Sequence, residues 1–512
     1  MRALSPPLLA ALTGATTVFA FAPFGVALLP IATLAVLFAL WRSAPGARSA
    51  ARIGFAFGAG LFGAGASWVY IALQTFGGMP VWLGVVATAG FVTYLSLWPA
   101  IAGACVAICA PRNAFAYALI AATAWTGAEW LRGYVFTGFP WLAAGYAALP
   151  DSPLAGYAPV GGAFFVSLTT ALCAAWIATI ADSLAQSTRR DSWIAVLAIG
   201  VVFIVGAALR QIQWSQPRGE PIAISLVQGN VAQDVKFVEE FRARTFALYT
   251  DLVERSRGRL IVLPESAFPM FADEVPQGVI QRLAAAAQSR NGDVLIGMFT
   301  ADEPLPGTDQ PRYYNTVVAV GVDPVQLYRK RHLVPFGETI PGKPVLGWFI
   351  RNVLAIPLAD QTPGAADQPL LSIAGHSVAV DICYEDAFGA ELIDAARSAD
   401  ILVNVTNDAW YGHSIAAWQH NQIAAMRALE LGRPMLRATN TGITSAIGVD
   451  GRVVAQLPWY TRGILELNVA GTVGLTPYVR FGDAPVLALV AATLLLGAWF
   501  RRARSKGPTR QR

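Results

Sequence analysis

Long apolar runs constrain this chain more than any other feature of its sequence. Seven fall within the first 210 residues and one precedes the C-terminal tail, with approximate bounds 7–23, 25–41, 54–73, 81–109, 114–131, 159–181, 192–209 and 484–500. A helix crosses a bilayer with roughly 20 apolar residues. Because hydrophobic residues also make up 55% of the chain and charged residues only 13%, the sequence predicts an α-helical membrane domain with about eight transmembrane helices.

Basic residues lie in alternate loops between these runs. They follow the second, fourth, sixth and eighth runs, and the main ones are Arg42, Arg48, Arg52, Arg112, Arg189, Arg190, Arg501, Arg502, Arg504 and Lys506. By the positive-inside rule both termini are expected in the cytoplasm, and segment 211–483 is expected outside, which in a bacterium is the periplasm. The net charge of +5 is therefore explained by basic residues in the cytoplasmic loops, and no nucleic-acid partner is expected.

Segment 211–483 has the pattern of an α/β domain. Short β-rich runs alternate with helical stretches at 237–257 and 277–289; the runs are 222–227, 260–263, 294–297, 316–320, 378–382, 401–405, 436–439, 445–449 and 464–467. About 270 residues suffice for one such domain. The predicted organisation is a membrane domain over 1–210, a catalytic domain over 211–483, and a last transmembrane helix with a basic tail over 484–512.

Cys383 is the candidate nucleophile. It follows the alternating apolar run 376–380 by three residues and precedes a helical segment near Ala390, a position where a strand-to-turn junction commonly exposes a nucleophile. The alternative is a small core residue, since free cysteines are often buried. The other cysteines, Cys105, Cys109 and Cys173, lie in apolar runs and have no metal-binding spacing, so neither a metal nor another cofactor is expected.

Two further reactive side chains follow β-like runs. Glu265 comes after 260–263, and Lys330 follows Tyr328-Arg329. Because functional groups gather at the carboxyl ends of strands in α/β sheets, these residues and Cys383 are expected to converge. A glutamate can remove the thiol proton and a lysine can stabilise an oxyanion.

The motifs around these residues resemble the nitrilase, or carbon-nitrogen hydrolase, superfamily. They are Leu263-Pro264-Glu265-Ser266, the segment 330–338 and Cys383-Tyr384-Glu385. With the apolar runs added, the chain resembles the membrane-embedded apolipoprotein N-acyltransferases of the bacterial envelope. Segments 137–141, 227–230, 313–315 and 407–412 also resemble that family. The resemblance implies an α-β-β-α sandwich for the catalytic domain.

The resemblance also implies residue roles. Glu265 is expected to act as general base and acid, Lys330 as oxyanion stabiliser and Cys383 as nucleophile. Supporting or substrate-binding roles are expected for a second set of residues: Glu338, Tyr384, Glu385, Phe237, Asn315 and Trp410. Phe237 differs from the family pattern, which often has tryptophan after Gln-x-x-Lys.

The implied reaction has two steps. Cys383 takes an acyl chain from a membrane phospholipid as a thioester, and the α-amine of an S-diacylglyceryl cysteine at an apolipoprotein N-terminus then accepts it. The implied location is the bacterial inner membrane, and a monomer is expected. The main alternative is a membrane-anchored amidase or nitrilase-type hydrolase; a transporter with a periplasmic sensor domain would need ionisable residues in mid-span, which are nearly absent.

A proline-framed apolar stretch at 340–357 contains Trp348 and Phe349. It is interpreted either as a core helix or as an arm that contacts the membrane surface, where aromatic residues are favoured. In the fifth run, Glu129 and Arg132 are spaced to pair with each other, and the alternative is a lipid-headgroup site.

The remaining charged and histidine residues have structural interpretations. His332 is expected to make a structural hydrogen bond, and His413 with His420 is not expected to bind a metal. A solvated or interdomain ion-pair face is expected for Arg427, Glu430 and Arg433.

Overall fold

The computed structural model describes residues 4–111, 113–185, 189–303, 312–339 and 361–505. The chain divides into two compact units. The first comprises Met1–Tyr70, Trp82–Gln213 and Arg480–Arg512, and the second comprises Ile71–Val81 and Trp214–Val479. The short segment Ile71–Val81 therefore groups with the second unit, although it joins two apolar runs and overlaps the end of the first. The sequence pattern did not indicate this grouping.

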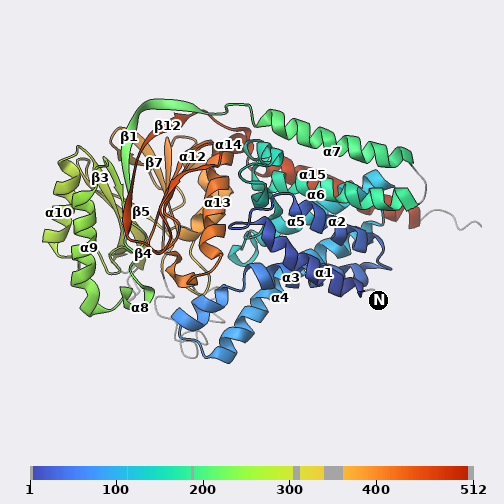
Figure 1. Ribbon diagram of the computed structural model, residues 1–512, viewed down its shortest axis with the longest axis horizontal. Coiled ribbons are helices and arrows are strands. Elements are labelled where there is room, and N and C mark those ends of the chain that lie inside the picture. The colour runs from blue at the N-terminus through green and yellow to red at the C-terminus, as the bar shows by residue number, and fades with distance from the viewer. Residues whose placement is uncertain (1–3, 112, 186–188, 304–311, 340–360, 506–512) are drawn as a thin grey trace, which may run out of the picture. The chain divides into compact units, whose positions relative to one another are not determined.

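Every predicted apolar run contains a helix in the first unit (Figure 1). The helices are α1 (Pro6–Thr16), α2 (Leu29–Arg42), α3 (Ala47–Gly65), α4 (Val81–Cys109), α5 (Ala114–Arg132), α6 (Ala158–Ala185), α7 (Arg189–Leu209) and α15 (Ala484–Ser505). Small residues allow close helix packing: a Cβ at Gly14 would lie 2.0 Å from the main-chain oxygen of Phe57, and one at Gly60 would lie 1.9 Å from that of Ala11.

Four apolar helical stretches in the described part of the chain are long enough to cross a membrane. They are Val81–Cys109, Pro153–Ile180, Ser192–Leu209 and Ala484–Arg502, while Pro6–Ala20 and Leu29–Arg42 are apolar but shorter. In the first apolar run the α-helix is shorter than expected. It ends at Thr16, and a 3₁₀ helix follows from Thr17 to Ala20. The count of eight spans stays a prediction.

The second unit contains two six-stranded β-sheets. The first has the order β12 (Gly463–Val473), β1 (Gln216–Gln228), β2 (Leu260–Val262), β3 (Asp293–Asp302), β4 (Arg312–Gly321) and β5 (Gln326–Arg329). The second has the order β11 (Val453–Gln456), β10 (Ser445–Ile447), β9 (Met435–Thr439), β8 (Ile401–Thr406), β7 (His376–Ile382) and β6 (Leu371–Ile373). The predicted α/β sheets are therefore present.

Helices cover these sheets. Figure 1 shows α9 (Arg242–Arg255) and α10 (Gln277–Gln288) beside the first sheet, and α13 (Ala416–Leu431) beside the second. Buried residues of α9, α10 and the strands form one apolar core that includes Leu252 and Leu283. The central strands run parallel in both sheets: β1, β2 and β3 in the first, and β7, β8 and β9 in the second. Parallel strands are buried on both faces, which explains why short continuous apolar runs identified them.

Candidate active site

The three predicted catalytic residues follow the carboxyl ends of three strands. Glu265 lies three residues after β2, Lys330 directly follows β5, and Cys383 directly follows β7. All three are buried, with exposed fractions of 6%, 1% and 8%. The first sheet supplies the carboxylate and the ammonium and the second sheet supplies the thiol, so the site is assembled from both layers of the second unit.

The backbone at Cys383 makes a sharp turn. Its φ is +55°, a conformation that costs a non-glycine residue on the order of 1 kcal/mol or more, and a short 3₁₀ helix, η8 (Cys383–Ala387), begins there. Burial raises the pKa of the Cys383 thiol well above its usual value; the Glu265 charge raises the pKa further, while Lys330 lowers it. The thiol therefore keeps its proton until a base removes it.

Lys330 lies between two carboxylates. Its Nζ is 2.7 Å from Glu338 Oε1 and 3.4 Å from Glu265 Oε1. Burial alone would lower the Lys330 pKa, but the charges of Glu338 and Glu265 outweigh burial and hold the pKa well above its usual value. The lysine therefore stays charged, and its charge acts on the Cys383 thiol, as an oxyanion stabiliser requires.

Glu265 is held by two further donors. Asn315 Nδ2, on β4, donates to Glu265 Oε1 at 2.8 Å, and the main-chain N–H of Asn407 donates to Oε2 at 2.9 Å. Asn315 is therefore placed to orient the candidate base. Sequence reasoning assigned no role to Asn407, although it opens the motif 407–412.

Glu385 tethers the segment after β5 to the strand that carries Cys383. Its carboxylate accepts hydrogen bonds from the main-chain N–H groups of Arg331 (2.6 Å), His332 (3.0 Å) and Ile382 (2.6 Å) and from the hydroxyl of Tyr328 (3.0 Å). Burial raises the pKa of Glu385. This carboxylate fixes the spacing between Lys330 and the nucleophile.

Aromatic contacts support the same segment. The ring of Tyr384 lies 5.0 Å from that of Phe388, and His332 stacks on Phe388 at 3.7 Å. His332 Nδ1 is 2.9 Å from Glu391 Oε1, so the structural hydrogen bond predicted for His332 is confirmed.

A buried ion cluster (Asp386, Asp408, His420 and Arg437) lies behind the nucleophile. His420 Nδ1 is 2.8 Å from Asp408 Oδ1, and its Nε2 is 2.9 Å from Asp386 Oδ1 and 3.2 Å from the Cys383 carbonyl. Arg437 donates to Asp386 Oδ2 at 2.8 Å and to Asp408 Oδ2 at 3.2 Å.

The charges in this cluster depend on one another. Burial and Arg437 lower the His420 pKa, but Asp386 and Asp408 outweigh them and raise it to about 9. Sequence reasoning missed this cluster, although one signal was available: Arg437 is a charged residue inside the mostly apolar strand 435–439.

In the described ranges, no group of three or more His, Cys, Asp or Glu side chains could hold a metal ion.

A solvated ion-pair face, one of the two interpretations of Arg427, Glu430 and Arg433, was wrong, and the interdomain alternative stays a prediction. Arg427, Glu430 and Arg433 are 2%, 0% and 1% exposed. Arg427 pairs with Glu430 at 3.0 Å, and Arg433 donates to main-chain carbonyls of Ala399 and Gly474. Most of α13 is buried, so Arg427 and Glu430 pair with each other inside the protein rather than in water.

Phe237 and Trp410 form a partly exposed aromatic group. Their exposed fractions are 38% and 37%, and their ring centroids are 6.5 Å apart. Trp410 also contacts Phe76 at 6.3 Å, on the segment Ile71–Phe76 that belongs to the same unit. The predicted arm residues Trp348 and Phe349 lie outside the described residues.

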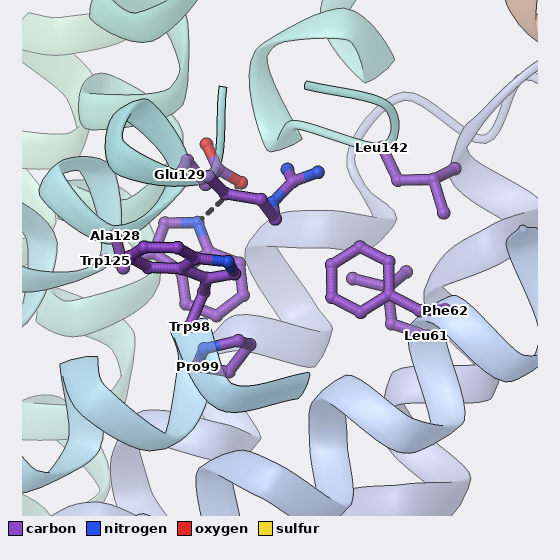
Figure 2. Close-up of a pocket in the computed structure, with 9 residues that line it drawn as sticks. Leu61, Phe62, Trp98, Pro99, Trp125, Ala128, Glu129 and Leu142 are labelled. Atoms are coloured by element: carbon purple, nitrogen blue, oxygen red, sulfur yellow. Dashed lines mark hydrogen bonds between the residues drawn. The ribbon is translucent and has the colours of Figure 1, made fainter. Parts of the chain in front are cut away.

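Glu129 and Arg132 are buried inside the first unit. Trp125 Nε1 donates to Glu129 Oε1 at 2.9 Å (Figure 2). The main-chain N–H of Ala144 donates to the same oxygen, also at 2.9 Å. Arg132 donates to the carbonyls of Phe139 and Trp141. The adjoining cavity has a volume of only about 10 Å³, which is too small for a lipid headgroup.

The chain is similar to two families over complementary segments. Residues 13–176 match the family described as apolipoprotein N-acyltransferase N-terminal domain, and residues 206–478 match carbon-nitrogen hydrolase. The chain is 49% identical over 485 residues to the apolipoprotein N-acyltransferase of Nitrosomonas europaea, covering 95% of each chain. It is 43% identical to that of Ralstonia nicotianae (97% and 94% covered) and 42% identical to that of Methylococcus capsulatus (98% of each).

Proposed function

The chain belongs to the apolipoprotein N-acyltransferase family, and from this premise we propose that Cys383, Glu265 and Lys330 carry out its reaction. The enzyme N-acylates lipoproteins, with a lipoprotein as acceptor and a membrane phospholipid as acyl donor. The observation that best supports the proposed site is the convergence of a buried thiol, a carboxylate and a cation after three strands.

In the first step, the Cys383 sulfur attacks the ester carbonyl of the phospholipid. Glu265 removes the thiol proton as the carbon–sulfur bond forms, which the raised pKa of Cys383 makes necessary. The Lys330 ammonium stabilises the oxyanion of the tetrahedral intermediate. Glu265 then returns the proton to the departing glycerol oxygen, leaving a thioester and a lysophospholipid.

In the second step, the α-amine of the S-diacylglyceryl cysteine attacks the thioester. Glu265 accepts a proton from the amine, the carbon–sulfur bond breaks, and the proton passes to the Cys383 sulfur as the amide forms. Glu338 and Asn315 orient Lys330 and Glu265 through the contacts described above. Phe237 and Trp410, together with Trp348 and Phe349, are proposed to contact the apolar parts of the substrates.

We also propose an arrangement in the membrane, supported by the basic residues of alternate loops. The protein is a monomer in the bacterial inner membrane with eight spans, both termini in the cytoplasm and a periplasmic catalytic domain. Its domains are 1–210, 211–483 and 484–512. Reporter fusions after Arg190 should report the cytoplasm, and fusions within 211–483 should report the periplasm; a cytoplasmic signal from the latter would refute the arrangement.

Mass spectrometry of the acyl-enzyme tests the reaction. Purified protein mixed with phospholipid and no amine should gain one acyl chain on Cys383, because the buried thioester is shielded from water. A diacylglyceryl peptide with a free N-terminal amine should discharge it as an N-acyl peptide, and a peptide with a blocked amine should not. Cys383→Ser should form little adduct, whereas Cys173→Ser, another buried cysteine, should behave as the wild type.

The hydrolase alternative gives a different result in the same experiment. Fatty acid would be released steadily without any amine, at the rate of lysophospholipid formation. That outcome would refute the transferase mechanism, and an adduct on a residue other than Cys383 would refute the proposed nucleophile.

A further inference from the structure

A second buried lysine borders the candidate active site. Lys236 ends the short helix α8 (Gln233–Lys236) and is 2% exposed. Its Nζ donates to the main-chain carbonyl of Glu265 at 3.0 Å. The family motifs on which the catalytic roles rest give this lysine no role, and the two-step reaction above does not use it.

Lysine is rare in this chain. The sequence contains 37 basic residues, and only Lys236, Lys330, Lys343 and Lys506 among them are lysines. The two that the structure describes are both buried beside Glu265. Arginine is always protonated and presents a broad planar fork, whereas lysine is a compact cation whose protonation responds to its surroundings. The chain thus has lysine at two buried positions where the cation must be compact and its protonation can depend on the neighbouring charges.

The environment of Lys236 differs from that of Lys330. Lys330 has carboxylates at 2.7 and 3.4 Å. Among the residues that the structure describes, the Lys236 ammonium donates a single hydrogen bond, to a neutral carbonyl. An ammonium has three donors, and burial without a paired charge is costly. An apolar side chain would fill this position at a lower cost, so stability alone does not account for a lysine here.

The charge of Lys236 is coupled to the reacting groups. Burial lowers its pKa, the negative charges of Glu265 and Cys383 raise it in part, and the net pKa is about 8. Such coupling is reciprocal: if a thiolate favours the charged lysine, the charged lysine favours the thiolate by the same free energy. Glu265, Lys330 and Asp408 are the charged groups that shift the Cys383 pKa most, and the coupling with Lys236 adds to their effect.

We propose that Lys236 is a second positioning cation of the active site, which holds the Glu265 main chain and stabilises the negative charge on Cys383 during thioester formation and breakdown. This inference rests on the proposed function, because it takes Cys383 as the nucleophile. It assigns separate tasks to the two lysines. Lys330 faces the carboxylates and the oxyanion, and Lys236 fixes the base and favours the thiolate.

Alkylation of Cys383 by iodoacetamide tests directly whether the positive charge of Lys236 favours the Cys383 thiolate. The full-length protein in detergent is treated between pH 6 and pH 10, and modification of each cysteine is followed by peptide mass spectrometry. Lys236→Met should slow alkylation of Cys383 about tenfold at pH 7, equivalent to a rise of about one pKa unit in the thiol. The difference from wild type should shrink as pH rises through about 8, where Lys236 loses its proton. Lys236→Arg keeps the positive charge and should therefore slow alkylation of Cys383 less than Lys236→Met does.

Cys105, Cys109 and Cys173, in the first unit, serve as internal controls and should react equally in all variants. A folded Lys236→Met protein with the wild-type pH profile at Cys383 would overturn the proposal, even with reduced acyl transfer, because the lysine would then be only structural. If Lys236→Met does not fold, Lys236→Gln replaces it in the same assay. Failure of both to fold would assign the lysine to the fold and also overturn the proposal.

Failure of the proposed function is distinguishable from failure of this inference. If wild-type protein forms no acyl-enzyme on Cys383, the proposed nucleophile is wrong whatever Lys236 does. If wild type forms the acyl-enzyme and Lys236→Met forms it at the same rate, only the role of Lys236 is wrong.

Discussion

The buried ion cluster predicts a specific pH dependence of stability. His420 has a pKa of about 9 in the folded protein against about 6.5 in an unfolded chain. The folded state therefore binds the proton more tightly, and the stabilisation is fully present below about pH 6.5 and lost as pH rises through about 9. The difference between the folded and unfolded pKa of His420 corresponds to about 3 kcal/mol in the free energy of unfolding.

Replacing His420 with glutamine removes this titration. We expect the free-energy difference between wild type and His420→Gln to fall by about 3 kcal/mol between pH 6 and pH 10. The measurement is thermal unfolding of the full chain in detergent at a series of pH values. Because His420 Nε2 also lies 3.2 Å from the Cys383 carbonyl, acylation of Cys383 should slow as well.

His413→Gln is the matched control, since this exposed histidine stacks on Tyr460 and lies outside the ion cluster. Its stability should follow the wild-type pH curve. Parallel curves for wild type and His420→Gln would refute the reasoning, because they would show that His420 has the same pKa in the folded and unfolded states.

Three other substitutions test the remaining contacts. Lys330→Met should lose roughly two to four kcal/mol of transition-state stabilisation, about a hundredfold or more in the rate of thioester formation; normal turnover in the folded variant would remove Lys330 from the mechanism. Glu385→Gln should leave at least one buried main-chain N–H unsatisfied and cost about 1–3 kcal/mol in unfolding experiments, whereas Glu391→Gln, which is partly exposed, should cost less; equal losses would contradict the tether. Gly412→Ala should destabilise by about 1–3 kcal/mol, because φ is +55° with ψ −156° and Ile71 Cγ2 lies 3.3 Å from the added Cβ; an unchanged melting temperature would argue against that contact.

The sequence by itself determined the helices, most strands and the candidate reactive residues. Continuous apolar runs specify helices such as α4, because apolar length is a local property. Short β-rich runs likewise identified the strands before Glu265 and Cys383. The resemblance to a known family then supplied roles for these residues and for Lys330, because each lies within a short motif.

Only the tertiary structure decided what surrounds those residues. Asp386 and Arg437 are 51 positions apart, and Glu385 reaches Arg331 across 54 positions, so their contacts depend on the order and register of strands. Burial has the same origin: Arg427 and Glu430 have a spacing typical of a solvated pair, yet both are enclosed. Charge and spacing are local, whereas solvent access and partners are set when the sheets and helices pack, because packing decides which charges leave water and what replaces it.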